Sequence, residues 1–409
     1  MQIGIIGGGV AGMFCALNLK GHSVTVLEKN EDTLKKMLIT GNGRCNATNL
    51  KSNSEFLENV LHNANFLHSS LNGFSAYDYI SFLTNNGVDI KLEDNNRVFP
   101  ATNKAITIKN CFDNLVSKSA ILKLNTCALS VKKVDEKFEV ETNNGCLYFD
   151  VLIVATGGVT YPTTGSSGDG YRFAENFSIL VNKPRGSLCG IRLVTVPENF
   201  EGLPLNCKLS IKSKGKVLCE NTGEFLFTGY GVSGPNVFTL TAKVDKHSIN
   251  GDSLCFDFLP NSSSEDVLGQ LKNYISLNQT KFVFHAVNSL LNIKIAKLLL
   301  LKLNIAENKQ CAQISNKELN LIVNAIKNFE LEIDNFDNVE RATVTRGGIN
   351  VKEVNPKTME SKKVENLFFI GEVLDVDALS GGYNLQIAYS TAYACATYLN
   401  EKFKGEQNV

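Results

Sequence analysis

The 409-residue chain begins with MQIGIIGGGVAGMFCALNLKGHSVTVLEK, residues 1–29, and this stretch indicates its fold. The apolar run Gln2–Ile6 predicts a short strand, and the glycines after it predict a tight turn. The stretch from Val10 to about Leu19 predicts a helix, and Ser23–Leu27 predicts a second strand. Strand, glycine turn, helix and strand in this order are typical of a dinucleotide-binding unit with a parallel sheet.

The turn carries the GxGxxG spacing at Gly7, Gly9 and Gly12. Gly7 allows the sharp turn, Gly9 lets the backbone approach a pyrophosphate, and Gly12 lets the helix pack closely on the strand. Glu28 follows Gly7 by 21 residues, where a carboxylate accepts hydrogen bonds from an adenosine ribose. The alternative, a glycine turn that only packs a helix onto a sheet, leaves Glu28 and the extra Gly8 unexplained. We therefore predict dinucleotide binding.

Composition narrows the classes of partner. Lys+Arg and Asp+Glu both number 41, so we expect no broad basic field, no nucleic acid and no membrane surface as partner. The 11 cysteines form no CxxC pair, and the first strand begins at residue 2, which favours reduced thiols in a cytoplasmic protein. His62 and His68 have no carboxylate or cysteine at ligand spacing, so we predict no metal site. The pattern leaves the oligomeric state open.

Both ends of the chain supply glycine-rich turns to one predicted site. Lys35–Asn49 is dense in Gly, Asn, Thr and Arg, which predicts a loop whose amides face a ligand. The buried strand Asp150–Ala155 ends in Thr156-Gly157-Gly158, at the edge of the sheet where ligands bind. The last strand, Leu367–Ile370, is closed by Gly371 and Glu372, and Ser380-Gly381-Gly382 opens the final helix.

The middle of the chain predicts two inserted parts. Short alternating strands separated by Gly, Asn and Pro predict an antiparallel β-barrel over 189–258, and helical stripes predict a small helical domain over 259–335. The nucleotide-binding domain then comprises 1–188 and 336–409, with 339–345 as a candidate return strand of the barrel.

The motifs, taken together, resemble a known family. GGGVAG, GNGRCNATN, VATGGVTYPTTGSSGDGY, FTGYGVSGPN, TRGGI, NPKTMES and LFFIGEVLDVDALSGGYNLQ look like those of bacterial FAD-dependent oxidoreductases of the aminoacetone oxidase or BaiN-like family. The motifs are spread from residue 3 to about residue 397. The resemblance implies a Rossmann-like FAD domain of the two-dinucleotide-binding type built from both chain ends, a β-barrel substrate domain and a small helical domain.

The resemblance also implies a non-covalent FAD and a set of residues around it. The ADP half is assigned to Gly7, Gly9, Gly12, Glu28 and Lys29, with the backbone of Ala128 at the adenine. The flavin is assigned to Lys36, Gly43, Arg44, Cys45 and Asn46, and the second phosphate-side turn to Thr156 and Gly157. The ribityl chain and the isoalloxazine are assigned to Gly371, Glu372, Gly382, Tyr383 and Asn384.

Three functions from different classes follow. The first is an oxidoreductase that exchanges a hydride between FAD and a small organic substrate, or a transiently bound NADH or NADPH, since the sequence shows only one complete dinucleotide-binding unit of strand, GxGxxG turn and helix. The second is an amine or amino-ketone oxidase that uses dioxygen. The third is a non-catalytic or RNA-modifying flavoprotein, whose RNA version the balanced charge disfavours.

The catalytic residues stay open at this stage. Cys45 beside Arg44 is either a reactive thiolate or a small side chain that fills the loop. Tyr161 and Tyr383 are candidate proton donors on the basis of location alone, and Tyr161 is equally well explained as a turn residue.

Overall fold

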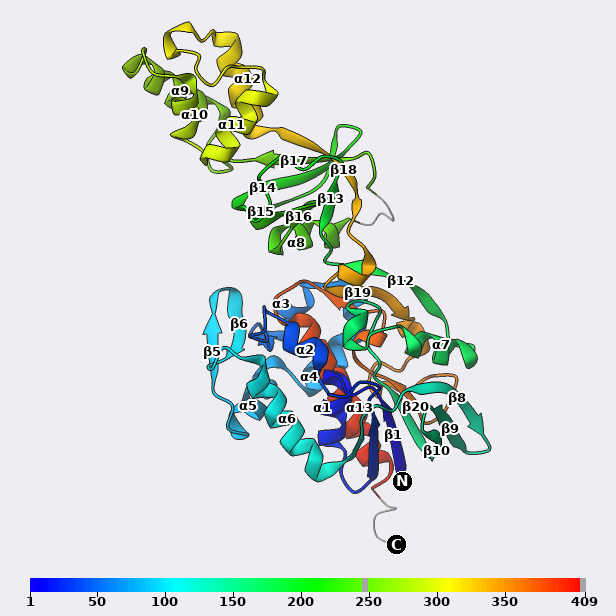
Figure 1. Cartoon of the computed structure of the whole chain (residues 1–409). Coiled ribbons are helices and arrows are strands. Elements are labelled where there is room, and N and C mark those ends of the chain that lie inside the picture. The colour runs from blue at the N-terminus through cyan, green and yellow to red at the C-terminus, as the bar shows by residue number, and fades with distance from the viewer. Residues whose placement is uncertain (245–248, 405–409) are drawn as a thin grey trace. The chain divides into compact units, whose positions relative to one another are not determined.

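The computed structural model describes residues 1–244 and 249–404. It divides the chain into two compact units (Figure 1). Unit 1 comprises Met1–Ser187 together with the chain from Asn338 onward, and unit 2 comprises Leu188–Asp337. The separate helical domain over 259–335 stays a prediction, because barrel and helices contribute to one cluster of buried apolar residues.

A five-stranded sheet forms the centre of unit 1, with all neighbouring strands parallel. Its strands, in spatial order, are β20 (Leu367–Phe369), β11 (Val151–Val154), β1 (Gln2–Ile6), β2 (Ser23–Leu27) and β7 (Ile121–Lys123). Every residue of β11 is buried, as a strand covered on both faces requires. The Rossmann-type α/β fold predicted from residues 1–29 is confirmed.

Helices from distant parts of the chain cover one face of this sheet. In Figure 1, α1 (Val10–Asn18) lies beside α6 (Ala105–Ser119) and α13 (Tyr383–Lys402), and both contact it. Phe14 of α1 lies at the centre of an aromatic cluster with Phe74, Tyr79, Phe82, Phe112 and Tyr389. The first and last helices are thus joined through one core.

Smaller sheets and helices surround the main sheet of unit 1. The sheets are β8 (Ala128–Val134), β9 (Lys137–Thr142) and β10 (Gly145–Phe149); β3 (Thr48–Asn49), β5 (Ile90–Glu93) and β6 (Arg97–Pro100); β4 (Val60–His62) with β21 (Asp377–Ala378); and β12 (Val181–Ser187) with β19 (Val344–Ile349). The remaining helices are α2 (Lys35–Ile39), α3 (Asn53–Leu57), α4 (His68–Gly73), α5 (Ala76–Asn85) and α7 (Asp169–Asn176).

The loop predicted over Lys35–Asn49 is only partly a loop. Its first five residues form α2, because Met37 is buried and gives this turn an apolar side to pack. The glycine-rich remainder is irregular up to β3, as predicted.

Unit 2 contains a closed antiparallel barrel. Its strands, in spatial order, are β13 (Ile191–Leu193), β16 (Gly231–Ser233), β15 (Lys216–Thr228), β14 (Pro204–Ser213), β17 (Ser253–Asp257) and β18 (Phe329–Phe336). The helix α8 (Pro235–Lys243) packs against β14, β15 and β16. The helices α9 (Ser264–Leu277), α10 (Val283–Asn288), α11 (Ile293–Lys302) and α12 (Asn316–Lys327) lie in the chain between β17 and β18.

The predicted return strand of the barrel at 339–345 is wrong. The barrel closes through β18, which pairs with β13 and β17. The alternating sequence FELEIDNF fits a strand, but it directly follows the apolar stripe of α12, which favours including it in the helical part. Val339–Arg341 forms a short 3₁₀ turn, and β19 after it pairs with β12 within unit 1.

Candidate FAD site

The glycine turn after β1 is shaped by close backbone contacts. Gly7 has a φ of +112°, and a Cβ on it would lie 2.4 Å from the carbonyl oxygen of Ala155. A Cβ on Gly12 would lie 2.0 Å from the carbonyl oxygen of Gly7. Gly9 differs, because nothing lies within 4 Å of a Cβ placed there and no side chain caps α1. The first amides of α1 therefore face open space that fits a pyrophosphate.

Glu28 ties the end of β2 to this turn. Its side chain is buried, with Oε2 accepting from the Gly8 amide at 2.7 Å. Oε1 accepts from the backbone amide and the side-chain amide of Asn30, at 2.8 and 2.6 Å. A Cβ on Gly8 would lie 3.0 Å from Glu28, which explains the extra glycine. Because a carboxylate offers about four acceptor positions, it retains capacity for a ribose hydroxyl.

Lys29 is held by an ion pair. Its Nζ lies 2.9 Å from Asp169 Oδ2 and also donates to Ser167. Asp169 begins α7, so this pair fixes the glycine-rich loop before α7 to the end of β2. The assignment of Lys29 to the ADP half stays a prediction, and the contact gives it a positioning role in addition.

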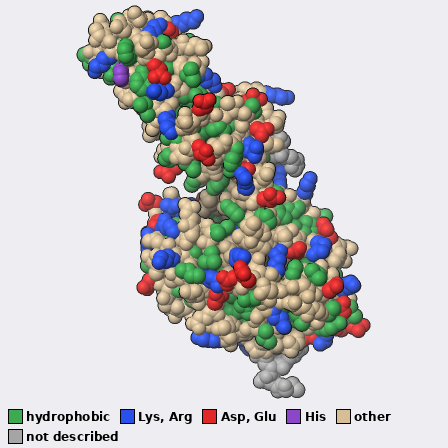
Figure 2. All heavy atoms as spheres, in the orientation of Figure 1, with side chains coloured by type: hydrophobic (Ala, Val, Ile, Leu, Met, Phe, Trp, Pro, Cys, Tyr) green, Lys and Arg blue, Asp and Glu red, His purple; other side chains and the backbone are tan. Residues whose placement is uncertain are grey.

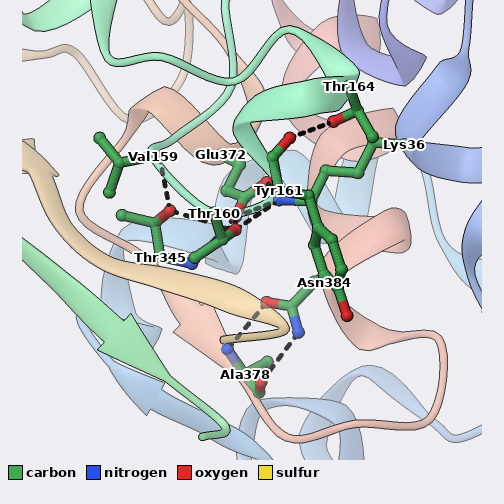
Figure 3. Close-up of polar contacts among 9 residues, drawn as sticks. All are labelled: Lys36, Val159, Thr160, Tyr161, Thr164, Thr345, Glu372, Ala378 and Asn384. Carbon is green, nitrogen blue, oxygen red and sulfur yellow. Dashed lines mark hydrogen bonds and ion pairs between the residues drawn. The ribbon is translucent and has the colours of Figure 1, made fainter. Parts of the chain in front are cut away.

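Lys36 and Glu372 meet at the centre of the candidate site, as Figure 3 shows. Lys36 Nζ lies 2.7 and 2.9 Å from the two Glu372 oxygens and donates to Thr160 Oγ1 at 2.7 Å. Glu372 Oε1 also accepts from the Thr345 amide at 2.9 Å. Both charged side chains are about one-quarter exposed, at 24% and 21%. The pair can therefore exchange part of its mutual hydrogen bonding for a polar ligand.

The second phosphate-side turn contains a buried hydroxyl without a partner among the described residues. Thr156 Oγ1 is fully covered and makes no hydrogen bond. A Cβ on Gly170 of α7 would lie 2.3 Å from it, so α7 packs directly on this turn. Gly157 adopts a φ of +73°, where glycine is favoured.

The loop between α2 and β3 fixes Arg44 by several contacts, whereas the side-chain oxygen of Asn46 has no partner among the described residues. The guanidinium of Arg44 pairs with Glu93, lies 4.1 Å from the ring centre of Phe99 and donates to Asn103. Arg44 is thus fixed to the β5–β6 hairpin. Asn46 Oδ1 is buried without a hydrogen-bond partner among the described residues, and such an atom needs a donor. Gly43, in the same loop, adopts a φ of +80°.

Cys45 lies in the core rather than on the surface of the loop. Its side chain is 0% exposed, and its φ is +60°. Burial raises the pKa of the Cys45 thiol to about 12, although a hydrogen bond with Thr40 opposes this. The thiol therefore stays protonated at neutral pH, which supports the view that Cys45 fills space.

The start of α13 packs against the same loop. Gly382 has a φ of +96°, and a Cβ on it would lie 2.4 Å from the Thr48 carbonyl carbon. Among the described residues no side chain caps α13, so its first amides can bind an electron-rich group. Tyr383 is buried against Phe56, with ring centres 5.0 Å apart, and burial raises its pKa.

Asn384 fixes the segment that precedes α13. Its side-chain oxygen accepts from the Ala378 amide at 3.0 Å, and its side-chain nitrogen donates to the Ala378 carbonyl at 2.8 Å (Figure 3).

Gly371 comes close to α1, because a Cβ on it would lie 2.7 Å from the Ala11 Cβ. Tyr161 begins a turn with a φ of +53°, and burial raises its pKa. Ala128 is buried at the first position of β8.

His62 is a residue that sequence reasoning passed over. Its Nδ1 lies 2.6 Å from Oδ1 of Asp377, a carboxylate that is 0% exposed. Ligand spacing in a sequence relates residues that are close along the chain. His62 and Asp377 are 315 positions apart and meet only through the pairing of β4 with β21. The available signal is the acidic pair Asp375 and Asp377, which follows the predicted strand Leu367–Ile370 by a few residues, but nothing in the sequence indicates their partners.

These features fit FAD. An uncapped helix with open space faces a phosphate position, a buried glutamate follows β2, and a second uncapped helix meets a loop with an unpaired amide oxygen.

Within residues 1–244 and 249–404, no three His, Cys, Asp or Glu side chains gather in a way that could hold a metal ion. The helices in the described part of the chain also include none long and apolar enough to cross a membrane.

Comparison with known proteins covers almost the whole chain. Residues 1–398 match the family described as HI0933-like protein Rossmann domain. A ribosomal RNA dihydrouridine synthase of Haemophilus influenzae is 32% identical, over 97% of this chain and 98% of that protein. A 3-dehydro-bile acid delta(4,6)-reductase of Clostridium scindens is 26% identical, over 96% and 97%. The solved structure of 3-ketosteroid delta1-dehydrogenase from Sterolibacterium denitrificans has a TM-score of 0.52 at 12% identity, over 98% of this chain and 99% of that one, and supports the fold.

Two substitutions separate a binding role of the glycine turn from a structural one. We expect Gly9→Ala to leave the FAD-free protein stable to within about 1 kcal/mol, because its Cβ meets nothing, but to weaken FAD binding. Gly12→Ala should destabilise the fold by at least about 2 kcal/mol, because its Cβ overlaps a carbonyl oxygen. Thermal unfolding without FAD and FAD titration measure both effects. Unchanged FAD affinity in Gly9→Ala would contradict a pyrophosphate at this position.

The buried thiol of Cys45 gives a second prediction. With a pKa of about 12, roughly one thiol in 10⁴ is ionised at pH 8, so iodoacetamide should leave it unmodified in the folded protein. Cys146 is exposed and serves as the internal control that should be alkylated. Mass spectrometry of the peptides gives the readout, and equal modification of the two cysteines would restore Cys45 as a reactive thiol.

Proposed function

The chain belongs to the HI0933-like Rossmann family of FAD-dependent oxidoreductases, and we propose that it reduces a carbon–carbon double bond conjugated with a carbonyl group. One observation carries this proposal: two relatives that match this chain over nearly their whole length are named for such a reduction on different substrates. Dihydrouridine is uridine reduced at the double bond conjugated with a ring carbonyl. A delta(4,6)-reductase of a 3-keto bile acid acts on double bonds conjugated with the 3-carbonyl.

The residues of unit 1 supply what such a reaction needs. FAD, once reduced, provides the hydride. The uncapped start of α13 offers amides that stabilise negative charge on a bound electron-rich ring. Lys36 and Glu372 offer a cation and a hydrogen-bond acceptor side by side for polyhydroxylated and charged groups. A nicotinamide serves in this proposal as a transient donor, because GxGxxG follows a strand of the parallel sheet only at Gly7–Gly12. The same spacing at Gly229–Gly234 lies in the antiparallel barrel.

The direction of the reaction is tested by anaerobic rapid mixing. We expect NADH or NADPH to bleach the flavin, and the reduced protein to be reoxidised without oxygen by a 3-keto-4,6-diene steroid or by a uridine-containing ribosomal RNA fragment. A mass gain of two hydrogens in the acceptor confirms the transfer. Bleaching by aminoacetone alone, with peroxide release on admission of air and no reoxidation by either acceptor, would make the protein an oxidase instead.

The distribution of charge favours the RNA fragment as the first substrate to test. The equal totals of basic and acidic residues hide a local difference in charge, because residues 259–328 contain eight lysines and four acidic residues. Lys272, Lys281 and Lys317 of this segment are exposed and have no ion-pair partner among the described residues. In Figure 2, basic and acidic side chains are interspersed over the visible face of unit 1. An excess of unpaired lysines is what a phosphate backbone attracts.

Charge reversal tests the RNA substrate. We expect the combined variant Lys272→Glu, Lys281→Glu, Lys317→Glu to bind the ribosomal RNA fragment more weakly, and its affinity to depend less steeply on salt by about one unit of log–log slope per lost phosphate contact. Fluorescence anisotropy at several salt concentrations measures this, while reduction of the steroid by the same variant should be unchanged.

The matched control reverses three exposed lysines of unit 1, as Lys118→Glu, Lys123→Glu, Lys132→Glu, with the same change in net charge. Equal loss of affinity in both variants would mean that net charge alone governs binding. Unchanged binding in the unit 2 variant would remove the helical segment as the RNA contact and favour a small-molecule substrate.

A further inference from the structure

The segment around His62 is fixed along the loop that leads into α13. The strand β4 pairs with β21, with His62 opposite Asp377. On one side of this pair the Leu379 amide donates to the Asn59 carbonyl at 2.9 Å. On the other side the Asn63 side chain donates to the Asp375 carbonyl at 2.6 Å. The position of the imidazole is therefore set by backbone pairing and by hydrogen bonds on both sides of it.

The carboxylate of Asp377 orients the imidazole. Asp377 is 0% exposed, and a buried carboxylate is costly unless both oxygens are hydrogen-bonded. Its Oδ1 lies 2.6 Å from His62 Nδ1, and its Oδ2 accepts from Ser187 Oγ at 2.7 Å. The Nδ1 proton of His62 is thereby directed to Asp377, which leaves Nε2 as the nitrogen that can serve another group. The His62 side chain is 27% exposed, so part of the imidazole is accessible.

This pair lies next to the part of the site expected to hold the flavin ring. Asp377 directly precedes Ala378, whose amide and carbonyl are both bonded to the Asn384 side chain in the first turn of α13 (Figure 3). The other candidates, Cys45, Tyr161 and Tyr383, are less suited to donating a proton, because burial raises the pKa of each. His62 combines partial exposure with an orienting carboxylate.

We propose that His62, oriented by Asp377, donates the proton that completes the reduction, an inference that rests on the proposed function. Reduced FAD, when bound, would supply the hydride for the C–H bond at the carbon β to the carbonyl, and the π electrons of the double bond would move to the α-carbon. The proton on His62 Nε2 then forms the second C–H bond at that α-carbon. The substrate gains two electrons, FAD is oxidised, and His62 regains its proton from water. Asp377 compensates the positive charge of the imidazole while both nitrogens are protonated.

Three variants test this role. His62→Gln removes the proton donor but keeps an amide that can bond to Asp377. Asp377→Asn tests the orienting carboxylate. His68→Gln is the matched control, because His68 is an exposed histidine at the start of α4 with no contact to the site. We expect anaerobic reoxidation by the acceptor to slow at least about 100-fold in His62→Gln and to stay within twofold in His68→Gln. Reduction of the flavin by NADH or NADPH should stay within twofold in both histidine variants.

Two readouts do not depend on turnover. In the FAD-free protein, proton NMR should detect a strongly hydrogen-bonded Nδ1–H that is lost in His62→Gln and retained in His68→Gln. In the oxidised FAD-bound protein, a phenol that mimics the enolate should bind about tenfold more weakly to His62→Gln, because one charge-assisted hydrogen bond is lost. Asp377→Asn should weaken phenol binding while His62 is still present.

The outcomes separate this inference from the proposed function. Normal reoxidation and phenol binding in His62→Gln, with the wild-type protein active on the acceptor, would overturn the role of His62 and leave the function in place. Failure of the wild-type protein to be reoxidised by any conjugated double bond would overturn both. Loss of the NMR signal in His68→Gln would show that the signal does not come from the His62–Asp377 pair.

Discussion

The close approach of backbone segments at the carboxyl end of β1 is the constraint on which unit 1 depends. Gly7 lies against the end of β11, Gly12 lies against Gly7, and Gly371 lies against α1. At each contact a single added carbon atom would collide with its neighbour. The three chain segments can therefore meet there only if these positions are glycine. This packing also leaves space in front of α1, because the residue that precedes the helix is Gly9, which has no side chain to cover the first amides.

Electrostatic contacts then join the two ends of the chain at the same place. Lys36 belongs to the first quarter of the sequence and Glu372 to the last strand–helix connection, and their ion pair is completed by Thr160 and Thr345 from two further segments. A pair with one-quarter exposure is a moderate source of stability, since solvent screens it. Its importance lies in its position, because it brings charges of both signs to one point without adding net charge.

The sequence predicted the parts of the site that depend on local geometry. The glycine spacing, the strand before it and Glu28 after it all follow from short-range steric rules, and the structure places them together as expected. Contacts between distant segments could not be predicted in this way. Pairing of His62 with Asp377 depends on two short strands 315 residues apart, and neither residue alone indicates the other. Similarly, β18 was missed because its alternating pattern directly follows a helix with a strong apolar stripe.

The placement of α9–α12 in the chain has a consequence for how this protein can change in evolution. The helices lie between β17 and β18, which are neighbours in the barrel and pair with Phe256 opposite Phe329. Just beyond these residues, Lys327 bonds to Asp257 and to the Leu259 and Ser262 carbonyls, so the segment enters and leaves at one clamped point. In topological terms the helices are an enlarged hairpin connection. Their length and surface can therefore change without a change in the strand order or register of the barrel, because both ends of the segment stay fixed between two paired strands.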